Sequence, residues 1–94
     1  MKILWTAEAL DDLATITAYY HAEVNPRTAN AVQQRILEQI QSLPPFPERI
    51  RQSERIPGAR ELVVHRLPYI VFVKLTHDAI VVLNIVHTAR KFPA

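Results

Sequence analysis

The chain has 94 residues, 49% of them hydrophobic, with one glycine, no cysteine and a formal net charge of +2. This composition excludes a disordered chain, a disulfide scaffold and any thiolate metal site, and the length predicts a single domain over residues 1–94. No apolar run reaches the roughly 18 residues of a membrane span, and no signal peptide follows Met1, so we expect a cytoplasmic protein.

Charge is divided unevenly along the sequence. Residues 1–24 carry one lysine against four acids, a net charge of −3, whereas residues 25–94 carry ten lysines or arginines against five acids, a net charge of +5. Most of the cations are arginines, which suit bidentate pairing with phosphates and carboxylates. The basic part favours an acidic partner, either a nucleic acid or an acidic protein segment, and a solvated surface of mixed sign is the alternative.

The first half of the sequence predicts one strand and two helices. Residues 1–5 are typical of a short strand, and Thr6 is placed to cap a helix from about residue 7 to 22, whose apolar positions recur every three or four residues. A second helix starts at residues 25–26, with asparagine as the cap and proline first, and must end before Pro44. The short link between the two predicts an antiparallel helical hairpin.

The second half is irregular at first and then extended. Residues 44–58 are rich in proline and arginine and end at the only glycine. Three apolar runs follow, at residues 60–65, 69–75 and 79–86, and the short links between them are typical of hairpin turns. We therefore predict an α+β fold in which the N-terminal strand is followed by a helical hairpin packed on a small antiparallel sheet.

Most catalytic classes lack the residues that they need. One glycine cannot build a phosphate-binding loop, and the four histidines lie on separate elements without the spacing of metal ligands, so we expect no metal and no cofactor. Antiparallel pairing brings together one group of polar side chains at an end of the sheet: His65, Arg66, Tyr69, His87 and Arg90.

This group has two interpretations. Arginines there would bind a phosphate, and a histidine or tyrosine would transfer a proton in RNA cleavage. Alternatively, Arg66 and Arg90 are surface charges, Tyr69 belongs to the core, and the histidines are held by backbone partners. The aromatic residues Trp5, Phe72 and Phe92 are expected in the core rather than in a base-stacking surface.

Several segments also carry a family resemblance. They are residues 57–64, residues 68–72 and the ending at residues 85–93, where His87, Arg90, Phe92 and Pro93 form a His-x-x-Arg-x-aromatic-Pro pattern. With the start at residues 4–6, these segments resemble the RelE/ParE superfamily, the toxins of bacterial type II toxin–antitoxin modules, and most closely its ParE-like branch. The resemblance implies the fold predicted above, growth inhibition, a role in plasmid maintenance, and a hetero-oligomer with an antitoxin whose C-terminal segment wraps the toxin.

The resemblance leaves the target open. ParE-like members poison DNA gyrase and are not nucleases, whereas RelE-like members cleave mRNA on the ribosome. Tyr69 stands where the ribonuclease branch typically carries an arginine, and Phe92 has no proton to give in place of a late tyrosine, so we expect a gyrase poison. The alternative is a metal-independent mRNA endonuclease that uses the five clustered residues named above, and a non-toxic module that binds an antitoxin is a third hypothesis.

Binding residues are expected mainly among the cations. The candidates for contact with the target or the antitoxin are Arg49, Arg51, Arg55, Arg60, Arg90, Lys91 and Phe92. Arg60 and Glu61 are also expected to serve the structure, because they open a strand beside Gly58 and an Arg–Glu arrangement there fixes the loop to the sheet. We further expect the antitoxin to cover the apolar and arginine-bearing surface with a segment that folds on binding.

Overall fold

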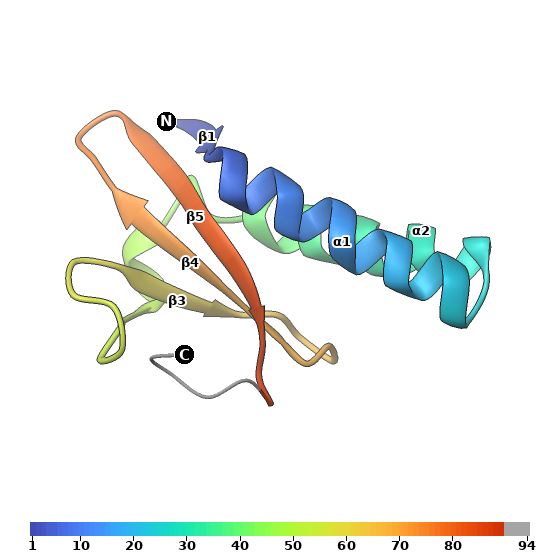
Figure 1. The fold of residues 1–94 in the computed structure, drawn as a ribbon. Helices are drawn as coiled ribbons and strands as arrows, with labels where there is room; N and C mark the ends of the chain where they lie inside the picture. Colours follow the sequence, from blue (N-terminus) through green and yellow to red (C-terminus); the bar gives the residue numbers. More distant parts are fainter. Residues whose placement is uncertain (90–94) are drawn as a thin grey trace.

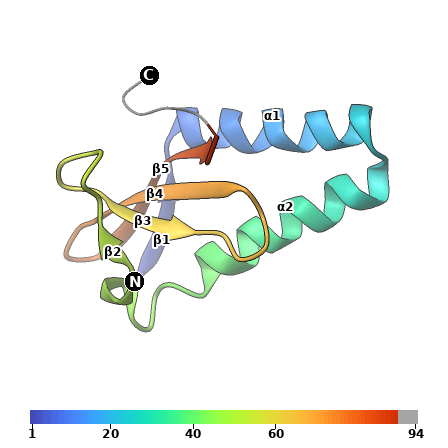
Figure 2. The same cartoon turned by 90° about the horizontal axis from the view of Figure 1, so that it is seen from below.

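The computed structural model describes residues 1–89 as two layers, a pair of helices and a five-stranded sheet (Figure 1). The strand β1 (Lys2–Trp5) leads into α1 (Ala7–Glu23), and α2 (Pro26–Gln41) runs back along it (Figure 2). The elements that follow are the short 3-10 helix η1 (Pro47–Arg49) and the strands β2 (Arg51–Gln52), β3 (Arg60–Val63), β4 (Tyr69–Leu75) and β5 (Ala79–His87). The predicted α+β architecture is confirmed.

Both helices begin at the residues that the sequence indicates. The Thr6 hydroxyl accepts a hydrogen bond from the backbone N–H of Ala9 at 3.0 Å, and the Asn25 side chain accepts one from Thr28 at 2.7 Å. Each bond satisfies an amide that has no partner inside its own helix. The Thr6 hydroxyl also donates to the carbonyl of Leu83 at 2.7 Å, which joins the start of α1 to β5.

The sheet has the order β1-β5-β4-β3-β2, and two of its features differ from the sequence-based expectation. β3, β4 and β5 form the expected antiparallel meander, but β1 pairs in parallel with β5, from Lys2 opposite Ala79 to Trp5 opposite Val82, so the sheet is mixed. In addition, the segment expected to be irregular contains η1 and β2, and β2 adds a fifth strand beside β3.

The sheet is apolar on both faces, and the helices cover one of them. Leu62, Val71 and Val82 point to the helices and pack with residues such as Leu13 and Ile36. A smaller cluster on the other face contains Ile70, Phe72 and Val86, with Ile56 and Leu83 packed against it. β4 is therefore buried on both sides from Tyr69 to Val73, which explains the apolar sequence of these five residues. No helix among residues 1–89 is long and apolar enough to span a bilayer.

A hydrogen bond joins α1 to β5 next to an irregularity in the β4–β5 ladder. The register between these strands shifts at Phe72 and Val73. Beyond the shift, the Asp12 carboxylate accepts a hydrogen bond from the backbone N–H of Ile85 at 2.8 Å. A helix side chain thus takes the place of a neighbouring strand at this point of β5.

Candidate functional site

A groove runs between α1 and the C-terminal part of β5. Its first part encloses about 200 Å³, and the lining residues are Asp12, Thr15, Ile16, Tyr19, Tyr69, Ile85 and His87. Its second part, of about 480 Å³, is lined by Tyr19, Tyr20, Val24, Tyr69 and His87. Because the two parts share Tyr19, Tyr69 and His87, we treat them as one concave surface, called the α1/β5 groove below. Tyr19 is 58% exposed and forms an open aromatic wall.

The groove lies beside an open strand edge. β1 pairs with β5 only as far as Val82, so in the described part of the chain residues 83–87 have no strand on that side. At this edge the Asp12 carboxylate accepts a hydrogen bond from the backbone N–H of Ile85. The Thr6 hydroxyl likewise donates to the carbonyl of Leu83. An aromatic groove beside a strand edge that lacks a neighbouring strand is suited to an extended peptide segment, which would pair with the backbone groups that α1 leaves open.

Tyr69 lies at the floor of the groove and belongs to the core. Its side chain is 5% exposed, and its hydroxyl donates to the hydroxyl of Tyr20 at 3.4 Å. Burial and this hydrogen bond raise the pKa of Tyr69 well above its ordinary value of 10. The phenol therefore stays protonated at physiological pH and is a poor general base.

His87 contacts Tyr69 as the strand pairing predicts. The two residues are opposite one another in the β4–β5 ladder, and their rings meet edge to face with centroids 5.4 Å apart. The Nδ1 atom of His87 accepts a hydrogen bond from the backbone N–H of Ala89 at 3.0 Å, and the residue as a whole is exposed. This pair is the part of the expected polar group that the structure brings together.

The other members of that group are placed differently. His65 and Arg66 lie exposed in the turn between β3 and β4, where neither side chain makes a hydrogen bond or ion pair with any residue that the structure describes. Arg66 has a left-handed backbone with φ of 66°, which is rare for a bulky residue. Arg90 lies outside the described residues, as do the binding candidates Lys91 and Phe92.

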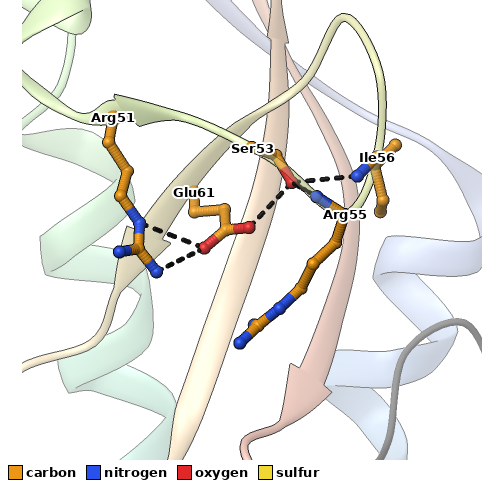
Figure 3. Close-up of polar contacts among 5 residues, drawn as sticks. All are labelled: Arg51, Ser53, Arg55, Ile56 and Glu61. Atoms are coloured by element: carbon orange, nitrogen blue, oxygen red, sulfur yellow. Dashed lines mark hydrogen bonds and ion pairs between the residues drawn. The ribbon is translucent and has the colours of Figure 1, made fainter.

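The arginine-rich loop is organised around one buried carboxylate (Figure 3). Glu61 is 4% exposed, and its Oε1 atom accepts from Nη2 and Nε of Arg51 at 2.8 and 3.3 Å. Its Oε2 atom accepts from the Ser53 hydroxyl at 2.7 Å, and that hydroxyl in turn accepts from the backbone N–H groups of Arg55 and Ile56. The carboxylate therefore connects β2, β3 and the loop between them.

The charge of Glu61 is maintained despite its burial. Burial by itself acts to raise the pKa, but the hydrogen bonds from Ser53 and Arg51 and the positive charges of Arg51 and Arg55 outweigh it. The pKa is consequently held below its ordinary value of 4.5. Glu61 is thus ionised at neutral pH and serves as a structural ion partner.

Arg60 and Arg49 hold loop carbonyls rather than face solvent freely. Arg60 donates to the carbonyls of Ile50 at 2.8 Å and Glu48 at 3.3 Å. Arg49 donates to the carbonyl and the hydroxyl of Ser42 at 3.0 and 2.9 Å. The expected link between loop and sheet therefore exists, but Arg60 makes it through backbone carbonyls and Glu61 makes it with Arg51.

Sequence reasoning missed Phe46 and the two tyrosines of α1. Phe46 is 72% exposed and lies between Pro45 and Pro47, next to a shallow, mainly apolar concavity of about 490 Å³. An aromatic residue between prolines can join neither a helix nor a central strand. This sequence feature could have predicted that Phe46 lies in an exposed loop. Phe72 is fully buried and Trp5 partly buried, as expected.

Three comparisons with known proteins agree. Residues 3–92 match the family described as the ParE toxin of the type II toxin–antitoxin system parDE. The Sinorhizobium fredii protein Y4kP, which carries a provisional toxin name, is 33% identical over 92 residues, covering 98% of this chain and 93% of that protein. A solved structure of the chromosomal ParDE toxin–antitoxin system from P. aeruginosa superposes with a TM-score of 0.85 at 30% identity, covering 93% of this chain and 95% of the other.

Proposed function

Because the chain belongs to the ParE family of type II toxins, we propose that it arrests growth by poisoning DNA gyrase and is neutralised by a cognate antitoxin. Its role as the toxic component of a toxin–antitoxin module follows from the family and from the likeness to the ParDE system. The gyrase target and the manner of neutralisation are the proposed parts.

The observation that carries the gyrase target is the burial of Tyr69. RNA cleavage needs a group that moves a proton, with cations beside it that hold the phosphate. Tyr69 stays protonated within the core, and its hydroxyl is bonded to Tyr20. His65 and Arg66 make no polar contact with it in the described part of the chain. Among the described residues, Tyr69 is contacted by the His87 ring but by no cation that would hold a phosphate, and such a surface is better suited to binding a protein than to cutting RNA.

The α1/β5 groove supports the antitoxin as partner. A segment that folds on binding contributes side chains and a strand of its own, so it needs a concave, apolar surface and free strand backbone. The groove provides the concave surface, with Tyr19 as its exposed wall, and among the described residues no strand pairs with residues 83–87 beside it. The net charge of +5 on residues 25–94 favours acidic residues elsewhere in that segment.

Two assays with the purified toxin test the target. We expect it to inhibit DNA supercoiling by gyrase and to trap cleaved DNA, and the antitoxin to abolish both effects when added first. Translating ribosomes that receive the same toxin should retain intact mRNA. His87→Ala should behave as the parent does, because the proposed activity needs no proton transfer. If the parent toxin cleaves mRNA and His87→Ala does not, the endonuclease would instead be established. If induction of the parent causes no growth arrest, the non-toxic module would be established.

A further inference from the structure

Residues 44–49, called the proline loop below, display an aromatic side chain outside both core clusters. Phe46 is 72% exposed, the largest exposed fraction among the large hydrophobic residues that the structure describes. It packs with neither of the two clusters that stabilise the sheet. The flanking prolines extend the apolar surface. The fold therefore gains little from this phenyl ring.

The loop that carries Phe46 is held rigidly. The backbone N–H of Phe46 donates to the carbonyl of the buried Leu43 at 3.0 Å, and the N–H of Arg49 donates to the carbonyl of Phe46 at 3.2 Å. Arg49 and Arg60 fix further carbonyls at the two sides of the loop. Proline restricts φ at three positions. Binding through this loop would thus cost little ordering entropy.

The loop and the groove lie apart. Figure 2 shows the green segment after α2 at the end of the molecule remote from the turn between α1 and α2, where Val24 closes the groove. The groove is concave and accepts side chains. The phenyl ring is largely exposed beside a shallow concavity of its own loop, and burying it takes a pocket on the partner, which a folded partner offers and an unfolded segment lacks.

We propose that Phe46 enters an apolar pocket on the folded protein that the toxin attacks, and that the proline loop is the toxin's target-binding element. The proposal rests on the proposed function in one respect, namely that the target is a protein. An aromatic side chain on a preorganised loop is the kind of residue that dominates an interface. Pro45 and Pro47 add apolar surface beside the ring, and the charged Glu48 and Arg49 line the same concavity, so the pocket should be apolar with a polar edge.

Growth arrest tests the loop without assuming gyrase. Phe46→Ala, Phe46→Leu and the control Leu10→Ala, which truncates a 55% exposed side chain on α1, are induced at matched levels. We expect Phe46→Ala to lose growth arrest while its Tm and antitoxin affinity stay unchanged, and Phe46→Leu and Leu10→Ala to keep arrest. Undiminished arrest by Phe46→Ala would overturn the proposal, as would a large fall in its Tm or an equal loss of antitoxin binding.

Binding to purified gyrase separates this proposal from the proposed target. We expect Phe46→Ala to weaken gyrase binding by about tenfold or more, the effect of an interface hot spot. If the parent toxin does not bind gyrase but Phe46→Ala alone abolishes growth arrest, the gyrase target fails and the role of the loop stands. If the parent binds gyrase and Phe46→Ala binds equally well, the target stands and the role of the loop fails.

Discussion

The α1/β5 groove and the proline loop both present aromatic side chains, but they are built in different ways. The groove combines Tyr19 of α1 with Tyr69 and His87 of the sheet, and its floor belongs to the core. The proline loop consists of six consecutive residues and carries Phe46 outside the core. The difference teaches that this small fold builds one aromatic surface by tertiary packing of distant segments and another within a few consecutive residues.

This contrast gives the two surfaces separate functions. We assign the groove to the antitoxin and the proline loop to the target, because a folding segment fills grooves and a folded partner accepts projections. Substitutions in one surface should therefore leave the function of the other intact. Four further predictions test this separation, from the largest expected effect to the smallest.

The largest difference concerns stability. Tyr69→Ala removes a buried side chain from the groove floor and should lower the free energy of unfolding by about 3–5 kcal/mol. Phe46→Ala removes an exposed side chain and should change it by no more than about 0.5 kcal/mol. Urea denaturation of both variants measures the two values. Similar losses in the two would show that the proline loop belongs to the core after all.

The second prediction concerns the ion pair that holds the arginine-rich loop. Glu61→Gln removes the charge that Arg51 contacts and should cost about 1–3 kcal/mol of stability. The pKa of Glu61 is lowered in the fold, so its contribution is complete above the ordinary value of 4.5 and is lost as pH falls through the folded value. Urea denaturation from pH 7 to pH 3 should therefore show a smaller loss of stability in Glu61→Gln than in the parent. Parallel pH profiles of the two proteins would show that the Glu61 ion pair does not contribute to the pH dependence of stability.

The third prediction is the counterpart of the Phe46 experiment, with a substitution in the groove in place of one in the proline loop. Tyr19→Ala truncates the exposed wall of the groove and should weaken antitoxin binding by about tenfold, or about 1.4 kcal/mol. Growth arrest by the variant alone should be unchanged. Calorimetry measures the affinity, and the parent complex should show a negative heat-capacity change because a folding segment buries apolar surface. An unchanged affinity would place the antitoxin elsewhere, and a heat-capacity change near zero would refute burial by a folding segment.

The smallest effect is expected at the turn between β3 and β4, which belongs to neither surface. Arg66→Gly removes a side chain from a left-handed position, and the relief outweighs the greater chain entropy of glycine by about 0.5 kcal/mol. The variant should therefore melt slightly higher and arrest growth as the parent does. Loss of arrest in a variant that melts normally would assign Arg66 to target binding.

Much of the fold could be predicted because its signals are local. Thr6 and Asn25 cap their helices as their positions indicate, and residues 69–73 of the apolar run are buried. At the candidate site, the contact between Tyr69 and His87 followed from antiparallel pairing alone. The partner of Glu61 did not, since Arg51 lies on β2, a two-residue strand too short to show a period.

The sequence by itself determined the helices, the meander and the family resemblance, because caps, periodicity and turn residues act over a few neighbouring positions. Only the tertiary structure decided three features: the parallel pairing of β1, the hydrogen bond that the Ile85 N–H donates to Asp12 across 73 positions, and the groove between α1 and β5. These features join distant segments, and their geometry depends on how the helical hairpin packs on the sheet. Phe46 lies between the two cases: its prolines are visible in the sequence, but only packing shows that its ring is left outside the core.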